Sequence, residues 1–209
     1  MAKQGSRYGR SRARRRRGLG VILALIAALI LAALLLPVLR GAPDAVRQAI
    51  YPLRHEETIR EAARRNGLEP AFVAGVIHTE SRFRTGARSP QGAYGLMQML
   101  PTTAEFVQQR SGIRGDFRDP ETNIRLGSWY LGYLQDRYRG DRRLMLAAYN
   151  SGEGTVDGWI SNEGFDIAED IPYEETRNYV DNSLQARRTY RDLYGANLSR
   201  DAGWSLPDV

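Results

Sequence analysis

Residues 70–81 read PAFVAGVIHTES, in which seven apolar residues at 71–77 stand just before a carboxylate, Glu80. If this stretch forms a helix, the apolar positions 72, 73, 76 and 77 lie eight, seven, four and three residues before Glu80. Residues at these spacings share one face of a helix with 3.6 residues per turn. The sequence therefore predicts a buried helix that carries a glutamate at its C-terminal end, on the side that faces the core.

Such a position changes the acidity of a carboxyl group. Burial removes water from around the charged form, and the partial negative charge at a helix C-terminus disfavours that form further. Both effects raise the pKa of Glu80, as a general acid that works near neutral pH requires. From this stretch alone, the alternative is a glutamate whose side chain simply reaches solvent at the helix end.

The basic character of the chain belongs to its N-terminal tail. The chain has 209 residues and a net charge of +6, but nine of its 30 basic residues and no acidic one lie within residues 1–40. The remainder holds 21 basic against 24 acidic residues, which gives no support to a globular domain that binds nucleic acid. There is no cysteine, so disulfides and thiolate metal ligands are excluded. The length fits one domain with appendages.

Residues 18–39 contain no charged residue and consist mostly of Leu, Ile, Ala and Val. As a helix the segment is about 33 Å long, enough to cross the roughly 30 Å hydrocarbon core of a bilayer. The arginines before it predict a cytoplasmic tail at residues 1–17, with the rest of the chain outside the cytoplasm. A cleaved signal peptide is the competing interpretation, although Arg40 stands near the expected small-residue cleavage site. An arginine-rich tail that binds RNA is a third.

The spacing of apolar residues beyond the anchor predicts helices almost throughout. Residues 40–54 form a spacer with a helical turn at 44–51, and residues 196–209 form a loose C-terminal tail. The expected helices are 55–65, 70–81, a short one after Pro101, a long one from Asp119-Pro120 to Tyr138, 144–149 and 173–194. Glycine and proline mark residues 82–95 as a loop and 150–154 as a turn. No alternating pattern is long enough for a sheet, beyond a small hairpin near Ser89, so the fold class is all-α with one domain over residues 55–195.

Four ordered segments carry the polar and aromatic residues that are typical of an active site. They are Glu80-Ser81, GAYGLMQ at 92–98, AAYNSG at 147–152 and ETRNY at 175–179. In this order and at these separations they resemble the lytic transglycosylases of the soluble lytic transglycosylase (SLT, goose-lysozyme-like) family. DPETNI at 119–124, with Gly127, Trp129 and Tyr130, fits the same pattern. The resemblance extends over about residues 55–195.

The resemblance implies a lysozyme-like helical domain that cleaves the β-1,4 bond between N-acetylmuramic acid and N-acetylglucosamine in peptidoglycan. Such enzymes add no water and instead close a 1,6-anhydro ring on the muramic acid. A glycosidic oxygen leaves only if it is protonated while an oxocarbenium-like centre develops. Glu80 matches the single catalytic acid of the family, which would donate this proton and then act as base toward the muramoyl 6-hydroxyl. Substrate assistance by the 2-acetamido group would replace a second carboxylate.

Three expected substrate-binding residues come from the first two segments, and each has a structural alternative. By resemblance, Ser81 lies beside the acid and orients it or the substrate; otherwise it bonds to backbone. The amide of Gln98 suits sugar hydroxyl and acetamido groups, unless it is simply solvated. Met97 is either a wall of the glycan groove or part of the core.

The other four come from the last two segments. Tyr149 and Asn150 are expected in the active site, although they also suit a helix end, which Asn150 could cap. Glu175 and Tyr179 are four residues apart and share a helix face, which places both in the site by resemblance and at the surface otherwise.

The two histidines, His55 and His78, form no ligand cluster, so neither a metal nor another cofactor is expected. His78 lies two residues before Glu80, on a different face, which favours a structural role. The aromatic residues of 129–138 are predicted to lie in the core. Arg84-Thr85 stands where the family commonly has Asn-Pro, a departure that bears on substrate preference more than on chemistry.

Together these features predict a single-pass membrane-anchored lytic transglycosylase whose catalytic domain lies on the cell-wall side of the membrane. Its partners are peptidoglycan glycan strands and, through the N-terminal helix, the membrane. Two alternatives stay open. The same fold could support a hydrolytic muramidase, and a domain without activity could bind glycan as a scaffold.

Overall fold

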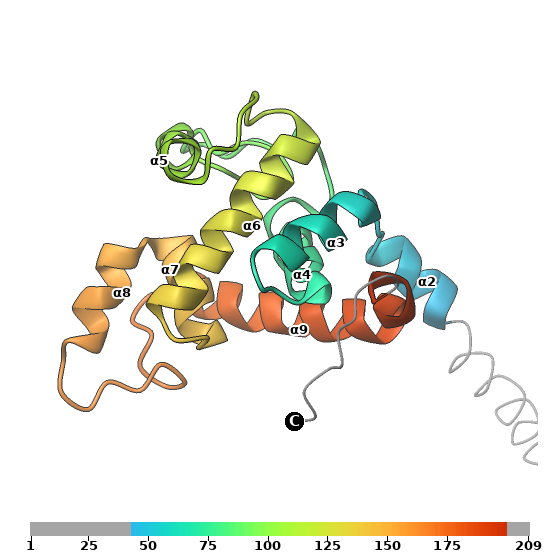
Figure 1. Cartoon of the computed structure of the whole chain (residues 1–209). Coiled ribbons are helices and arrows are strands. Elements are labelled where there is room, and N and C mark those ends of the chain that lie inside the picture. Colours follow the sequence, from blue (N-terminus) through green and yellow to red (C-terminus); the bar gives the residue numbers. More distant parts are fainter. Residues whose placement is uncertain (1–42, 200–209) are drawn as a thin grey trace, which may run out of the picture. The chain divides into compact units, whose positions relative to one another are not determined.

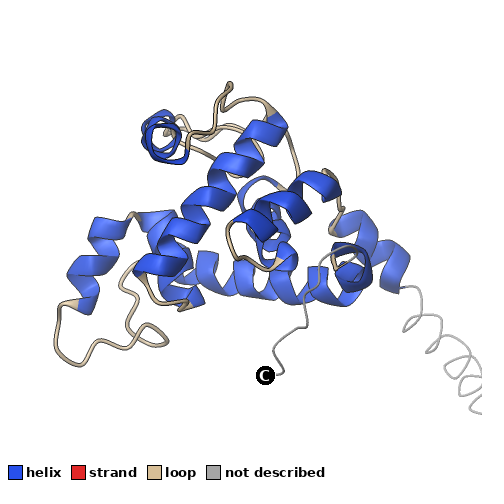
Figure 2. Cartoon of the chain, in the orientation of Figure 1, coloured by secondary structure: helices blue, strands red, loops and turns tan. Residues whose placement is uncertain are grey.

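The computed structural model describes residues 43–199 and confirms an all-α architecture for them (Figure 1 and Figure 2). Within this range the only extended pairings are two isolated bridges, Arg88 with Tyr94 and Tyr94 with Met99, at the place of the expected hairpin. Eight helices are described: α2 (Pro43–Ile50), α3 (Glu56–Arg65), α4 (Pro70–Ser81), α5 (Pro101–Ser111), α6 (Pro120–Arg137), α7 (Arg142–Ser151), α8 (Glu153–Ile160) and α9 (Glu174–Leu198).

Helix α4 forms the centre of the core. The chain divides into two units, Met1–Arg47 and Gln48–Val209, and α4 belongs to the second. All its residues from Ala71 to Ile77 are buried, and it packs along the long helix α9 (Figure 1). At Gly75 the two backbones come so close that a Cβ atom would lie 2.7 Å from the backbone nitrogen of Arg187. Glycine is therefore required where α4 meets α9.

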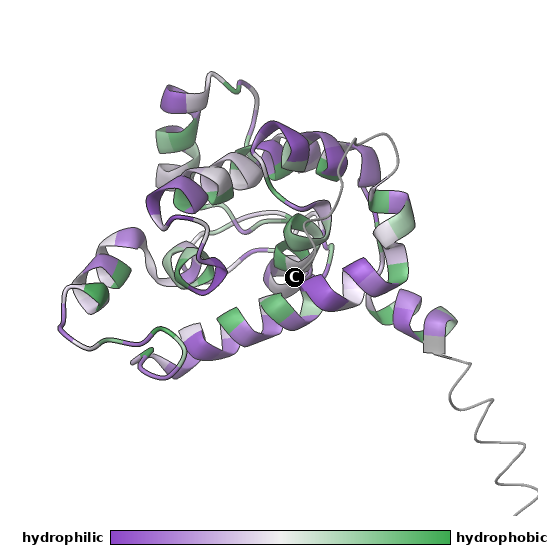
Figure 3. Ribbon diagram, turned by 60° about the horizontal axis from the view of Figure 1, so that its bottom comes forward, coloured by the Kyte–Doolittle hydropathy of each residue, from purple (hydrophilic) through white to green (hydrophobic). Residues whose placement is uncertain are grey.

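The helices of the second unit bury two clusters of apolar residues. Helix α3 contacts α4 and α6, while α7 contacts α6, α8 and α9. A smaller cluster between α5 and α6 contains Met99, Ala104, Val107 and Leu126. Figure 3 shows hydrophobic and hydrophilic positions alternating along α9, as expected for a helix with one face on the core.

Aspartates cap two of the helices: the start expected for α6 is confirmed, whereas α7 begins at Arg142, two residues before the expected position. Asp119 precedes α6, and its side chain accepts a hydrogen bond of 2.8 Å from the backbone nitrogen of Thr122. Asp141 caps α7 in the same way, at 2.8 Å from the backbone nitrogen of Arg143. Both aspartates satisfy backbone donors that have no partner inside their helix.

The structure differs from the expectation at two further places. Residues 153–160 form helix α8, where a glycine-rich turn was expected, because Val156 and Trp159 are three residues apart and bury one face together. Helix α9 continues past Tyr194 to Leu198, which is buried against the core and so extends the helix into the stretch expected to be loose.

The predicted membrane anchor at residues 18–39 lies outside the described residues. Among residues 43–199, none of the helices combines the length and the apolar composition that crossing a bilayer would demand.

Candidate active site

Glu80 lies in the last turn of α4, half-buried, with its carboxylate directed at α9. The hydroxyl of Tyr179 on α9 donates a hydrogen bond of 2.6 Å to its Oε1 atom. Tyr179 itself is only 8% exposed. The close approach of α4 and α9 at Gly75 therefore holds together two site residues that are far apart in the sequence.

Burial raises the pKa of Glu80 to about 7, and the hydrogen bond from Tyr179 opposes part of this shift. The hydroxyl lowers the pKa because it stabilises the charged form, whereas loss of water destabilises that form. The raised pKa expected from the sequence is thus present, with burial as its main cause. A glutamate that simply reaches solvent is not what the structure shows.

Tyr149 on α7 is a further neighbour of Glu80. Burial and the nearby charge of Glu80 together raise its pKa. Its hydroxyl donates a hydrogen bond of 2.8 Å to the backbone oxygen of Met97. Tyr149 therefore connects α7 to the loop of residues 92–99 beside the acid.

Ser81 and Met97 support this loop from inside. The hydroxyl of Ser81 lies 2.8 Å from the backbone oxygen of Leu96, and the residue is 1% exposed. Met97 is fully buried against Gly127 of α6, where a Cβ atom would lie 2.5 Å from the methionine sulfur. Neither side chain offers an exposed surface to a ligand, so the groove wall expected of Met97 is absent in this structure.

Gln98 is half-buried and adopts a left-handed backbone conformation with φ of 46°. Its Nε2 atom donates to the backbone oxygens of Gly95, at 2.9 Å, and of Ala87, at 3.1 Å. Both described bonds of the amide use its nitrogen, which leaves Oε1 as a possible acceptor for a ligand.

Asn150 and the start of α9 form the other side of the site. Thr176 donates a hydrogen bond of 2.8 Å to Oδ1 of Asn150, which leaves the Nδ2 donors of Asn150 for a ligand. Asn150 lies inside α7, and Gly152, not Asn150, caps that helix. Glu175 is exposed in the first turn of α9. Unlike Tyr179, it makes no described contact with the other expected site residues.

Asn123 was not among the expected site residues, although it supports the loop beside the acid. It is fully buried in α6. Its Oδ1 atom accepts from the backbone nitrogen of Met97 at 2.7 Å, and its Nδ2 atom donates to the backbone oxygens of Tyr94 and Phe117. The available signal was its place in DPETNI, a motif that already contributed to the family resemblance.

Three other carboxylates of the domain are engaged elsewhere. Asp119 caps α6, while Asp157 forms an ion pair with Arg137. Glu153 lies 3.7 Å from the same guanidinium group. Over residues 43–199, no three His, Cys, Asp or Glu side chains lie together as a set of metal ligands.

His78 packs away from the acid, as its position in the helix predicted. Its ring stacks on Tyr51 with 4.3 Å between ring centroids, and Nδ1 lies 3.4 Å from the Tyr190 hydroxyl. These contacts support the structural role.

Comparison with known proteins matches residues 57–171 to the model of the family described as Transglycosylase SLT domain. The soluble lytic murein transglycosylase of Salmonella typhimurium is 32% identical over 166 residues, which are 74% of this chain and 26% of that protein. The membrane-bound lytic murein transglycosylase C of Actinobacillus pleuropneumoniae is 31% identical over 161 residues, covering 63% of this chain and 44% of that protein. The chain thus spans about a quarter to under half of the length of these relatives.

Among solved structures, the 70 kDa soluble lytic transglycosylase of Escherichia coli superposes with a TM-score of 0.68 at 30% identity. The match covers 78% of this chain and 28% of that one. This confirms the lysozyme-like helical fold that the sequence predicted.

Proposed function

Because the chain belongs to the Transglycosylase SLT domain family, we propose that it is a peptidoglycan lytic transglycosylase with Glu80 as its single general acid and base. The reaction is cleavage of the β-1,4 bond between N-acetylmuramic acid and N-acetylglucosamine, with formation of a 1,6-anhydro ring.

The observation that carries the proposal is a carboxyl group with a pKa of about 7, held 2.6 Å from the Tyr179 hydroxyl. Such a group is protonated in about half of the molecules at neutral pH and can both give and take a proton. Its two causes of shift are burial and Tyr179, and no second carboxylate contributes. A two-carboxylate glycosidase would place its second acid within about 5–9.5 Å, where its charge would raise the pKa of the first.

The mechanism follows from this single group. Glu80 gives its proton to the glycosidic oxygen, and the bond between that oxygen and C1 of the muramic acid breaks with its electron pair on the oxygen. The 2-acetamido oxygen of the substrate stabilises the positive charge at C1. The 6-hydroxyl oxygen then bonds to C1, and its proton returns to the carboxylate of Glu80. No water is consumed, and the acid is regenerated.

The surrounding residues have three roles in this proposal. Gln98, Tyr149, Asn150 and Glu175 bind sugar and acetamido groups through exposed or half-buried polar atoms. Tyr179 touches the reacting carboxyl and tunes its acidity. Ser81 and Met97 do not touch the substrate, because each is buried. Each instead fixes the loop that presents Gln98.

Location is part of the same proposal. The basic tail at 1–17 stays in the cytoplasm, residues 18–39 anchor the chain, and residues 55–195 act on the cell wall outside. The apolar segment and its preceding arginines support this arrangement. One relative is also named as membrane-bound.

Digestion of purified peptidoglycan tests the proposal. The full chain in mild detergent is compared with Glu80→Gln and with Glu174→Gln, a matched change at an exposed glutamate. We expect soluble muropeptides with anhydro ends from the parent and from Glu174→Gln, and a loss of at least about a hundredfold in Glu80→Gln. Equal release by the parent and Glu80→Gln contradicts the proposal.

Mass spectrometry of the ends separates the two alternatives. Products heavier by one water identify a muramidase, because the anhydro ring lacks that water. Folded protein that binds peptidoglycan but releases nothing identifies the scaffold.

A further inference from the structure

Ser183 on α9 is a buried polar residue that takes no part in the proposed mechanism. Its side chain is fully buried, and its Oγ atom has no hydrogen-bond partner among the described residues. It lies one helical turn after Tyr179, and residues four apart are neighbours on the same face of a helix. An unpartnered hydroxyl therefore stands next to the residue that contacts Glu80.

The close contact of α4 and α9 explains a small side chain at this position but not a hydroxyl. A Cβ atom at Gly75 would lie 3.1 Å from the backbone oxygen of Ser183, so the two helices leave little room. Alanine would fit the same space, favours a helix more than serine does, and has no polar atom to bury. The serine hydroxyl therefore costs stability, and a buried polar group without a partner needs an explanation.

Burial without a partner does not by itself indicate a function. Ser128 on α6 is also fully buried, and its Oγ atom also lacks a partner within the described part of the chain. Ser183 is distinguished by its neighbour. Burial and the charge of Glu80 raise the pKa of Tyr179, and the Ser183 hydroxyl opposes this rise as a hydrogen-bond donor does. The contact is longer or less direct than an ordinary hydrogen bond, because none is described between the two hydroxyls.

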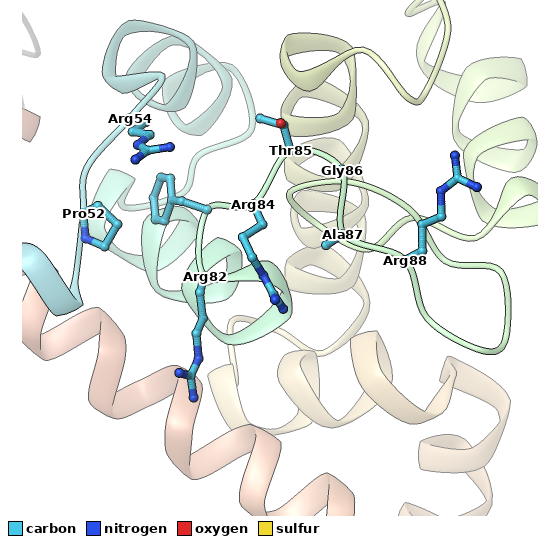
Figure 4. Close-up of a pocket in the computed structure, with 9 residues that line it drawn as sticks. Pro52, Arg54, Arg82, Arg84, Thr85, Gly86, Ala87 and Arg88 are labelled. Atoms are coloured by element: carbon cyan, nitrogen blue, oxygen red, sulfur yellow. The ribbon is translucent and has the colours of Figure 1, made fainter.

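The pocket beside the end of α4 does not account for the Ser183 hydroxyl. This pocket of about 560 Å³ is lined by Pro52, Arg54 and residues 82–88 (Figure 4). Neither Ser183 nor Tyr179 is among its lining residues. Ser183 thus belongs to the packed interface between α4 and α9, not to this pocket.

The proton of the Tyr179 hydroxyl is already engaged. A phenol has one proton, and Tyr179 donates it to Oε1 of Glu80 at 2.6 Å. The phenol oxygen can still accept, so between the two hydroxyls only Ser183 can be the donor. A donor to the phenol oxygen polarises the chain and makes Tyr179 a stronger donor to Glu80.

The direction of this bond decides which oxygen of Glu80 carries the acidic proton. With Tyr179 as the donor, Oε1 accepts, and the proton of the acid stays on Oε2. Over residues 43–199, Oε2 has no described partner and is not fully buried, so it is the oxygen open to a substrate. If the Tyr179 proton turned away, Oε1 could carry the acidic proton and donate it to Tyr179, away from the glycosidic bond.

We propose that Ser183 is a positioning residue that holds the Tyr179 hydroxyl as a donor to Glu80, so that the acidic proton of Glu80 stays on Oε2. The inference rests on the proposed function, because it assigns Ser183 a part in the same proton transfer. Ser183 acts through Tyr179 and is not itself a catalytic residue. It also lies outside the four segments that carry the family resemblance.

Cleavage kinetics provide the first arm of the test, with the full chain in mild detergent. Ser183→Ala is measured in the parent and in Tyr179→Phe, which completes a double-mutant cycle. Ser128→Ala is the matched control, because it removes an equally buried and equally unpartnered hydroxyl from another helix. Alanine fits both positions, since serine already places a Cβ atom there.

We expect Ser183→Ala to lower kcat by about two- to tenfold with KM unchanged, as the loss of one neutral hydrogen bond from the transition state does. In Tyr179→Phe the same change should have no further effect, because no hydroxyl is left to direct. Ser128→Ala should match the parent. An unchanged kcat in Ser183→Ala, an equal loss in the Tyr179→Phe background, or an equal loss in Ser128→Ala overturns the inference.

Titration of the Glu80 carboxyl by carbon-13 NMR provides the second arm and needs no substrate. The Tyr179 hydroxyl should lower the pKa of Glu80 by about one to two units, and polarisation along a hydrogen-bond chain changes each bond by roughly 10–30%. Ser183→Ala should therefore raise the pKa of Glu80 by about 0.1–0.6 unit, and leave it unchanged in Tyr179→Phe. An unchanged or lower midpoint in Ser183→Ala, or an equal rise in the Tyr179→Phe background, overturns the inference.

The two arms separate the inference from the proposed function. If the parent cleaves and Glu80→Gln does not, but Ser183→Ala matches the parent in both arms, the function holds and the role of Ser183 fails. If no protein cleaves peptidoglycan, but Ser183→Ala shifts the Glu80 titration only where the Tyr179 hydroxyl is present, the function fails and the contact from Ser183 to Tyr179 holds.

Discussion

Removing the Tyr179 hydroxyl should make Glu80 a weaker acid. In the structure this hydroxyl donates to Oε1 of Glu80 at 2.6 Å and lowers a pKa that burial raises. A hydrogen bond to a charged group contributes about 1.5–3 kcal/mol, and one pKa unit corresponds to about 1.4 kcal/mol. Tyr179→Phe should therefore raise the pKa of Glu80 by about one to two units from its value of about 7.

The pH dependence of peptidoglycan cleavage measures this shift. A general acid must hold its proton, so the basic limb of the profile should move upward by the same one to two units, roughly. Tyr149→Phe is the matched control, because Tyr149 donates to the backbone oxygen of Met97 and not to Glu80. Its basic limb should stay in place even if its rate falls. The reasoning is refuted if the limb of Tyr179→Phe stays near pH 7 or moves downward, or if both variants shift alike.

Three further predictions concern stability, each measured by urea denaturation of the full chain in detergent with tryptophan fluorescence. Folding raises the pKa of Glu80 from 4.5 to about 7, so its contribution to stability is complete below about pH 4.5 and is lost as the pH rises through about 7. Glu80→Gln should abolish that loss. The variant should be at most about 3 kcal/mol more stable than the parent at pH 8 and equally stable at pH 4. A difference in the free energy of unfolding that does not change with pH argues against the buried acid. Gly75→Ala should destabilise the fold by about 1–3 kcal/mol or more, since its Cβ would lie 2.7 Å from the backbone nitrogen of Arg187, and an unchanged midpoint contradicts the close helix contact. Asn123→Ala should cost about 2–4 kcal/mol, because the backbone nitrogen of Met97 and the backbone oxygen of Phe117 lose their bonds to its side chain, while the Tyr94 oxygen keeps only its bond from the Met99 nitrogen. A loss below about 0.5 kcal/mol contradicts its supporting role.

The sequence predicted the features that depend on local periodicity. The spacing of apolar residues before Glu80 was sufficient to place this residue at the buried end of a helix, and Asp119 and Pro120 were sufficient to locate the start of α6. Helix α8 was missed because its two glycines resemble a turn, whereas the burial of Val156 and Trp159 depends on neighbours far away in the chain.

The contacts inside the candidate site depend on tertiary structure. The family motif placed Tyr179 in the site, but its donation to Glu80 requires α9 to lie against α4 at Gly75. A pocket beside the end of α4 is lined by Pro52 and Arg54 together with the loop of residues 82–88, and no local pattern joins these two segments. Met97 also illustrates the limit, because its motif could not distinguish a buried methionine from an exposed one.

Direct titration of Glu80 tests the central claim most simply. Carbon-13 NMR of the side-chain carboxyl, assigned by comparison with Glu80→Gln, follows its ionisation without reference to any substrate. A midpoint near pH 7 agrees with a proton retained by burial. A midpoint near 4.5, as in an unfolded chain, would remove the physical basis for a lone acid at this position.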